Sequence, residues 1–296
     1  MSEMSIKNEE ELEYGILLRL RLREIGKEYG VEINETIIKY AFSELIQKLS
    51  RKEKVVVLID EYDRPILNHM NDGKAEVMRN ILREFYVVIK DSDPYLRFAI
   101  LTGITKLTKT GIFSSLNNLN DVTINKKYSQ MMEITQEELK EGFKDHIEET
   151  TKELNLNRKE LLEKIKEHYN GFSFDGIKSV YNPYSLLKFF DVQEFKNYWI
   201  ESGTPQYLIE YIKKHKVQTE EIIGEYVTET SLTTYEIENA PPIVYLIQSG
   251  YLTFKEKHEY LGYKVDYPNK EIKESMSELL LTGTYEIEEN AHVRKI

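Results

Sequence analysis

The sequence contains no cysteine among its 296 residues, and this absence excludes several kinds of chemistry. Disulfides, thiolate zinc sites and cysteine nucleophiles are all ruled out, and a reducing compartment is compatible. The chain also has no apolar run near the ~20 residues that cross a bilayer. Its first residues are acidic and polar, whereas a signal peptide would begin basic and then turn apolar. We therefore expect a cytoplasmic protein that has no membrane partner.

Positive charge is in the minority, because 51 Asp and Glu residues outnumber 40 Lys and Arg residues and give a formal net charge of −11. This balance argues against a general affinity for nucleic acid, although it is compatible with a local basic patch. The histidines include no pair at the i, i+4 spacing of a helical zinc site, so no zinc centre is expected. The length suits about two compact units.

The most informative segment that is present reads KVVVLIDEYDRPI, residues 54–66. Its apolar run, Val55–Ile59, predicts a central parallel strand buried on both faces, and Asp60 and Glu61 follow directly. Ligands bind beyond the carboxyl ends of such strands, where two carboxylates can hold hydrated Mg²⁺ and orient a water molecule. This is the Walker B pattern of P-loop NTPases. The structural alternative is a buried strand that stops at a solvated turn.

A second apolar segment, residues 96–101, predicts a neighbouring strand that ends on Thr102 and Gly103. The two strand ends are expected side by side, so that a hydroxyl lies next to the two acids. The following loop is rich in Thr, Ser, Lys and Asn and contains Lys106. A short third strand is predicted at residues 121–125.

Helical periodicity, capping residues and proline positions predict helices on both sides of these strands. We expect them over residues 10–29, 35–50, 78–88, 136–154 and 158–169, after Pro183 and Pro205, over 242–250, and over 270–281. A hairpin is predicted from 251–256 and 259–267. A helix, a two-stranded wing and another helix at the C-terminal end indicate a winged-helix-like segment.

Several longer motifs occur together and in one order: VVVLIDEYDRPI, RFAILTGITKLTKTGIFSSLNNLNDVTI, HYNGFSF with VYNPYSLLKFF, YWIESGTPQYLI, and IQSGYLTFK with YPNKEIKESM. On these motifs, roughly residues 9–280, the chain resembles the AAA-ATPase-like proteins. These are P-loop NTPases that usually carry a PD-(D/E)XK nuclease-like domain after the ATPase. The resemblance implies an α/β fold with an ATP- and Mg²⁺-binding core at 1–134, a helical lid region at 135–204 and a winged-helix-like region at 205–296.

The resemblance also implies roles for individual residues. Asp60 is similar to the Walker B aspartate that holds Mg²⁺, directly or through water, and Glu61 to the carboxylate that orients the attacking water. Thr102 resembles a sensor position for the terminal phosphate. Lys106 is a further candidate for contact with the nucleotide, with a solvated lysine as the alternative.

Two parts of the family pattern are not found in the sequence. Neither Gly-Lys pair is followed by Ser or Thr, so the Walker A loop, whose backbone N–H groups and lysine cradle the phosphates, is missing. No nuclease pattern follows Leu281. We therefore expect a truncated or divergent copy with weak or no ATPase activity. Its parallel sheet would be incomplete, and a protein partner or self-association would complete it.

Other hypotheses stay open beside this one. The chain can be a non-catalytic protein-interaction module or, third, a DNA-binding component through a wing of mixed charge. Asp60, Glu61 and Asp63 do not predict a nuclease metal cluster, because three acids on one extended segment do not converge on an ion unaided. Arg79 and Arg83 can stabilise phosphate charge, but an exposed helix face is the better interpretation.

Overall fold

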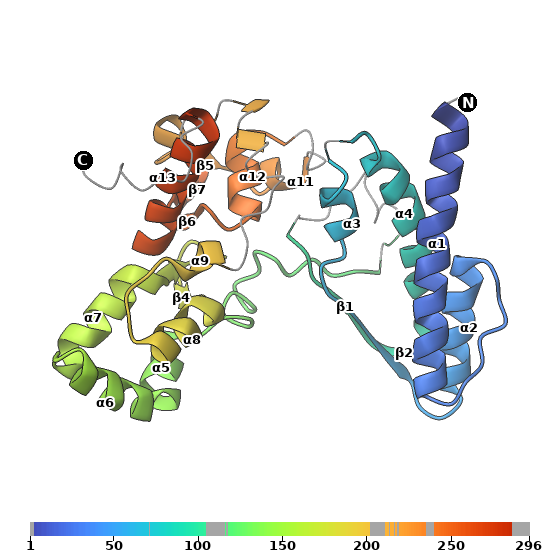
Figure 1. Ribbon diagram of the computed structural model, residues 1–296, viewed down its shortest axis with the longest axis horizontal. Helices are drawn as coiled ribbons and strands as arrows, with labels where there is room; N and C mark the ends of the chain where they lie inside the picture. Colours follow the sequence, from blue (N-terminus) through green and yellow to red (C-terminus); the bar gives the residue numbers. More distant parts are fainter. Residues whose placement is uncertain are drawn as a thin grey trace. The chain divides into compact units, whose positions relative to one another are not determined.

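The computed structural model describes residues 3–70, 72–104, 116, 118–201, 211–212, 214–215, 217, 219–234 and 240–285. Helices and short strands make a mixed α/β fold (Figure 1), as predicted. The chain forms two compact units whose main boundary lies between Asn120 and Asp121, and a short segment that begins at Thr233 groups with the first unit. The functional division at 134 and 204 stays a prediction. No helix in the described ranges is both long and apolar enough to span a membrane.

The first unit contains a parallel pair of strands with helices packed on one face. The strands are β1 (Val55–Ile59) and β2 (Leu96–Leu101), and Ile59 lies opposite Leu101. Both strands have the predicted bounds, and their predicted adjacency is confirmed. The other elements of this unit are α1 (Glu3–Glu28), α2 (Ile38–Ser50), α3 (Arg64–Leu67), α4 (Ala75–Asp91) and the 3₁₀ turn η1 (Asp93–Tyr95).

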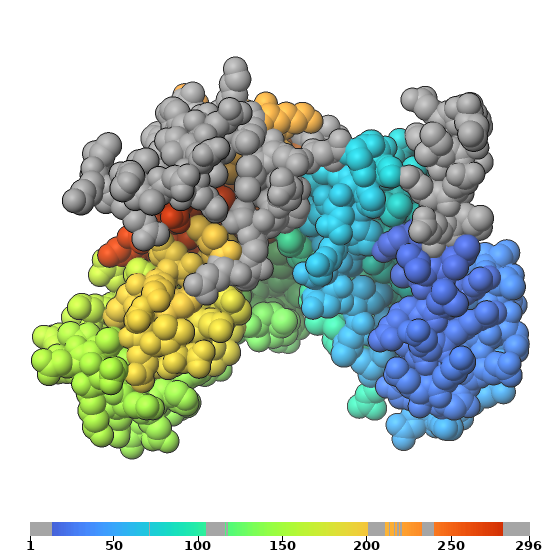
Figure 2. Space-filling model, in the orientation of Figure 1, coloured from blue at the N-terminus to red at the C-terminus, as the bar shows by residue number. Residues whose placement is uncertain are grey.

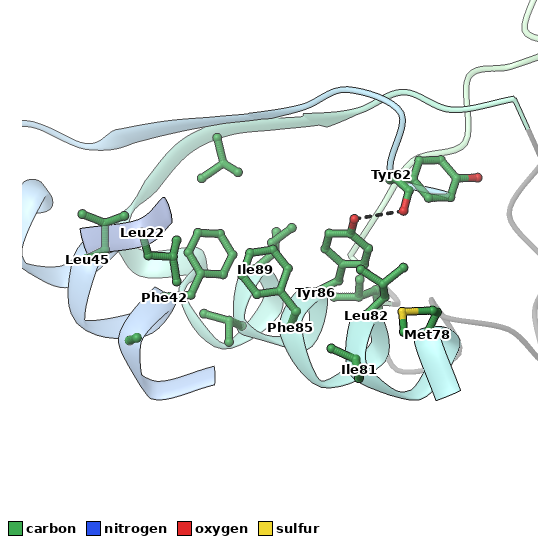
Figure 3. Close-up of a cluster of buried hydrophobic side chains, with 14 of the residues drawn as sticks. Leu22, Phe42, Leu45, Tyr62, Met78, Ile81, Leu82, Phe85, Tyr86 and Ile89 are labelled. Atoms are coloured by element: carbon green, nitrogen blue, oxygen red, sulfur yellow. Dashed lines mark hydrogen bonds between the residues drawn. The ribbon is translucent and has the colours of Figure 1, made fainter. Parts of the chain in front are cut away.

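Helix α4 supplies the centre of the first core, because its apolar residues recur at helical spacing. Met78, Leu82 and Phe85 are buried with Phe42 of α2, and Figure 3 shows them in one cluster. The rings of Phe42 and Phe85 stack, with centroids 4.5 Å apart and planes 12° apart. This cluster holds α2 and α4 against the inner face of the sheet.

The sheet is buried on one face only, which corrects the prediction that β1 is covered on both. Val57 points into the core and is 9% exposed, whereas Val56 and Leu58 on the alternate face are 48% and 69% exposed. Phe98, which pairs with Val56 in register, is 53% exposed. The sequence could not reveal this difference, because a run in which every residue is apolar does not mark which face is covered.

The chain from Asp121 onward is mainly helical. Its helices are α5 (Gln136–Gly142), α6 (Lys144–Glu153), α7 (Arg158–Tyr169), α8 (Pro183–Val192), α9 (Tyr198–Glu201), α11 (Ser231–Thr234), α12 (Pro242–Gln248) and α13 (Lys270–Tyr285), with a 3₁₀ turn η2 (Thr219–Glu221). Strands β3 (Asn170–Phe172) and β4 (Val180–Tyr181) pair antiparallel. An antiparallel sheet has the order β5 (Tyr226–Val227), β7 (Gly262–Asp266), β6 (Thr253–His258).

Capping residues fix several helix starts at the predicted positions. Helix α7 begins after Asn157, whose Oδ1 accepts from the N–H of Glu160 at 3.0 Å while the Glu160 carboxylate accepts from the N–H of Asn157 at 3.1 Å. Thr135 forms the same reciprocal pair at the start of α5. Asn182 caps α8 through Ser185, directly before Pro183. These contacts span three residues, so the sequence alone predicted them correctly.

Two sequence predictions fail in this part of the chain. The helix predicted over 136–154 is divided into α5 and α6 at Phe143, which leaves helical geometry at φ −110° and stacks on Phe190 with centroids 5.3 Å apart. The strand predicted at 121–125 is a turn, in which Asp121 Oδ1 accepts from the N–H of Thr123 at 3.0 Å. In both places a side-chain interaction outweighs the local pattern.

The predicted hairpin forms as β6 and β7, and it contacts the region predicted as the lid. The N–H of Ser173 donates to Thr253 Oγ1 at 2.7 Å, and this hydroxyl donates back to the Ser173 carbonyl at 2.9 Å. Gly171 has φ +127°, and a Cβ there would lie 2.0 Å from the carbonyl oxygen of Pro268, so glycine is required. Helix α8 contacts α6, and Figure 2 shows the yellow segment that contains α8 against the yellow-green segment that contains α6. The winged-helix assignment remains a prediction.

Candidate functional site

The polar residues that end β1 and β2 meet at one edge of the parallel sheet. The N–H of Thr102 donates to the carbonyl of Ile59 at 2.9 Å, which continues the strand ladder by one residue. The Thr102 hydroxyl then donates a hydrogen bond to Oδ1 of Asp60. The sequence predicted that these two residues would be neighbours, and the structure confirms that placement.

The Asp60 carboxylate is oriented through one of its two oxygens. Oδ1 accepts from the Thr102 hydroxyl and also from the N–H of Glu61 at 3.0 Å. Oδ2 has no hydrogen-bond partner among the residues that the structure describes. An oriented carboxylate with one oxygen open suits Mg²⁺, which usually binds one or two protein carboxylates and otherwise water and phosphate oxygens. The described residues contain no group of three His, Cys, Asp or Glu side chains able to enclose a metal.

Glu61 lies next to Asp60, but its side chain is engaged elsewhere. Its backbone is in the left-handed region at φ 51°, which few residues other than glycine adopt. Its carboxylate forms an ion pair with Arg64, three residues along, and both side chains are more than half exposed. An exposed pair of this kind contributes at most about 1 kcal/mol. Breaking this ion pair therefore costs little free energy, so the Glu61 carboxylate can turn to another partner.

Further hydrogen bonds join the segments that directly follow β1 and β2. The N–H of Tyr62 donates to the Thr102 carbonyl at 2.9 Å, and the Tyr86 hydroxyl donates to the Tyr62 carbonyl at 3.0 Å. Oδ1 of the buried Asp63 accepts from the N–H of Ile104 at 3.3 Å. Sequence reasoning did not identify Tyr62 or Tyr86 as part of the site, and it considered Asp63 only in a nuclease metal cluster that it did not favour. The glycine directly after Thr102 was the available signal of a close approach.

Burial and nearby groups alter the titration of Tyr86. Desolvation raises the pKa of the Tyr86 hydroxyl well above its usual value, and the nearby Tyr14 and Asp63 raise this pKa further. The hydroxyl therefore stays protonated and keeps donating to the Tyr62 carbonyl throughout the physiological pH range. This hydrogen bond links α4 to the segment that follows β1.

The remaining sequence-predicted candidates are placed only in part. Lys106 lies outside the described residues. Arg79 and Arg83 are on α4 and are partly buried rather than fully exposed. Arg83 Nη1 donates to Asn80 Oδ1 at 3.1 Å. Their contribution to phosphate binding stays a prediction.

The parallel strands with an acid and a hydroxyl at adjacent ends are features of nucleotide-binding α/β domains. Comparison with known proteins finds a sequence similarity in the same part of the chain. Residues 1–113 match the model of a family described as predicted AAA-ATPase. The N-terminal region is therefore similar to that family in sequence, over a range that includes both strand ends.

One curated relative is an "Uncharacterized protein in vnfD 5'region" of Azotobacter chroococcum mcd 1. It is 34% identical over 282 residues, which make up 93% of this chain and 52% of the relative. The chain thus spans about half the length of the relative that it matches. No solved structure matches the chain.

Proposed function

We propose that the N-terminal part of the chain is an AAA-ATPase-like nucleotide-binding domain, with its site at the ends of β1 and β2. The observation that carries this proposal is the hydrogen bond from the Thr102 hydroxyl to Asp60, at the adjacent ends of two parallel strands. These residues lie within the range that matches predicted AAA-ATPases. Acid and hydroxyl are the groups that a magnesium–phosphate site requires there.

In this proposal each residue has a separate task. Asp60 holds Mg²⁺ through its open carboxylate oxygen, directly or through water, and Thr102 keeps that carboxylate oriented and senses the terminal phosphate. Glu61 orients a water molecule after it leaves Arg64, and Lys106 contacts the nucleotide. When bound, Mg²⁺ neutralises the phosphate oxygens. From these 296 residues alone we expect binding with little or no hydrolysis, because no Walker A loop is among them.

The proposal is tested by titrating the purified chain with ATP in the presence and absence of Mg²⁺, using calorimetry. Replacing Asp60 with alanine removes the proposed metal ligand, so Mg²⁺-dependent affinity should fall at least tenfold. Asp91→Ala is the matched control, because Asp91 is an exposed aspartate at the end of α4. No binding by the unmodified chain at millimolar ATP would reject the proposal, as would equal affinity of the Asp60 and Asp91 variants.

A second candidate function, protein interaction, is favoured by the open face of the β1–β2 sheet. Val56, Leu58 and Phe98 place three large apolar side chains on this face, each about half exposed or more. We propose that a second copy of the chain covers this face. The sheet would then be covered on both faces, since helices already cover the inner one. Full burial of such a side chain from water is worth about 1.5–3 kcal/mol, and burying the part that is still exposed contributes a corresponding fraction of this.

Self-association through this face is tested by analytical ultracentrifugation over a range of concentrations. Leu58→Glu places a charge in the proposed interface and should shift a dimer to monomer. Leu187→Glu, on α8, is the matched control, because Leu187 is an exposed leucine in the other unit. A monomeric unmodified chain at all concentrations would exclude the second copy and leave a different protein as the partner to be sought.

A further inference from the structure

Asp63 is a buried carboxylate whose position the proposed nucleotide chemistry does not explain. Only 3% of the residue is exposed, although a buried carboxylate is costly unless hydrogen bonds compensate for its lost hydration. It directly precedes α3, yet its side chain forms no capping hydrogen bond with that helix. Its Oδ1 instead accepts from the N–H of Ile104, which is 41 residues away in the sequence.

The backbone after β2 lies directly against Asp63 and its neighbour Tyr62. A Cβ added at Gly103 would lie 2.6 Å from Asp63 Oδ1 and 2.7 Å from Cε1 of Tyr62. Both distances are too short for any side chain, so glycine is needed for this approach. The N–H of Tyr62 donates to the Thr102 carbonyl at 2.9 Å. Thr102 and Ile104 are thus hydrogen-bonded to the segment that follows β1, and Gly103 between them packs closely against it.

We infer that Asp63 is a positioning residue, which clamps the segment after β2 so that the Thr102 hydroxyl stays on Asp60. Thr102 itself is held by its strand hydrogen bond to Ile59 and by the Tyr62 N–H on its carbonyl, and the Asp63–Ile104 contact holds the chain two residues further on. Without the Asp63–Ile104 contact, the Tyr62–Thr102 hydrogen bond alone would hold this segment, which could then shift together with the Thr102 hydroxyl. Asp60 would then lose the donor that fixes its carboxylate.

The consequence for ligand binding rests on the proposed function, whereas the clamp itself does not. Groups that orient a metal ligand without touching the metal typically change metal affinity about 10–100-fold. Asp63→Ala should therefore lower Mg²⁺-dependent ATP affinity at least tenfold, although Asp63 touches neither ligand. Asp63→Asn should retain most of the affinity, because its amide oxygen still accepts from the N–H of Ile104.

The clamp is tested without nucleotide by NMR hydrogen exchange at single amides. In Asp63→Ala, exchange at Tyr62 and Ile104 should accelerate at least tenfold, while Val57 and Ala99 in the strands exchange as in the unmodified chain. Asp63→Asn should restore slow exchange, and Asp91→Ala should leave all four amides unchanged. Unchanged exchange at Tyr62 and Ile104 in Asp63→Ala would overturn the inference. So would equal acceleration along both strands, because that is general destabilisation.

The two measurements separate this inference from the proposed function. If the unmodified chain does not bind ATP, the proposed function fails, and the exchange pattern alone decides whether Asp63 is a clamp. If the unmodified chain binds ATP and Asp63→Ala binds it equally well, the positioning role is wrong even where exchange is faster. The inference is supported if Asp63→Ala accelerates exchange only at Tyr62 and Ile104 and also lowers the ATP affinity. Asp63→Asn should then restore that affinity.

Discussion

Glu61 combines a constrained backbone with an exposed side chain that pairs with Arg64. Its φ is 51°, and among the described residues other than glycine only Asn155 and Gln193 also have a positive φ. For most residues this conformation costs about 1 kcal/mol or more, whereas asparagine tolerates it better. A strained residue that directly follows the proposed metal ligand is consistent with a functional constraint on the turn, since such residues are retained where the surrounding structure fixes them.

The strain at Glu61 predicts that asparagine is preferred there over alanine. Both substitutions remove the ion pair with Arg64, so the difference between them reports the backbone alone. Glu61→Asn should be more stable than Glu61→Ala by about 0.5–1 kcal/mol in urea unfolding. The same two substitutions at the exposed Glu53, which is not in the left-handed region, should show no such preference. The same difference in unfolding free energy between the Asn and Ala variants at both positions would contradict the prediction.

Helix α13 carries a fully buried acid that fastens it to α9. Glu271 is 0% exposed, and its Oε1 accepts from the N–H of Trp199 at 2.9 Å. Desolvation raises the pKa of Glu271 to about 7, although hydrogen bonds from neighbouring groups act against this rise. Burial likewise raises the pKa of Glu133 to about 7. Both groups therefore titrate near neutral pH in the folded chain, and well below it in the unfolded chain.

These shifts predict that stability falls as pH rises from about 4.5 to about 7. In that window the folded chain keeps protons that the unfolded chain releases, so each added pH unit favours unfolding. The loss from Glu271 is on the order of 3 kcal/mol in total and levels off above pH 7. Glu271→Gln should remove this share of the pH dependence and Glu133→Gln a similar share, as measured by urea unfolding at several pH values. An unaltered slope in Glu271→Gln would contradict the assignment.

The residues that the structure describes include an apolar cluster in each compact unit. Phe42 and Phe85 belong to the first, and Phe189 and Tyr169 belong to the second. The two sets are drawn from either side of the division at Asn120. Each unit therefore has the buried apolar surface that an independently cooperative domain requires.

Separate cores predict two unfolding transitions in differential scanning calorimetry. Removing a buried phenylalanine ring typically costs about 3–5 kcal/mol. Phe85→Ala should lower the melting temperature of one transition and leave the other in place, and Phe189→Ala should do the reverse. A single transition that both variants lower equally would show that the units unfold together.

The sequence alone determined those features that depend on residues close together in the chain. The bounds of β1 and β2, the capped starts of α5, α7 and α8, and the β6–β7 hairpin all follow from patterns within a few residues. The polar residues Asp60 and Thr102 were predictable as neighbours for a related reason. Parallel strands end at the same edge of a sheet, so adjacent strands bring the residues that follow them together.

Only the tertiary structure decided which faces are buried, where a helix breaks and which distant residues contact the strand ends. The open face of β1, the break in the helix at Phe143 and the contact from Asp63 to Ile104 each depend on packing between residues far apart in the sequence. Such contacts leave no periodic pattern in the sequence, because the residue type Asp does not indicate whether its carboxylate is buried or exposed. The acids of the strand end were therefore visible in the sequence, and the groups that hold them in place were not.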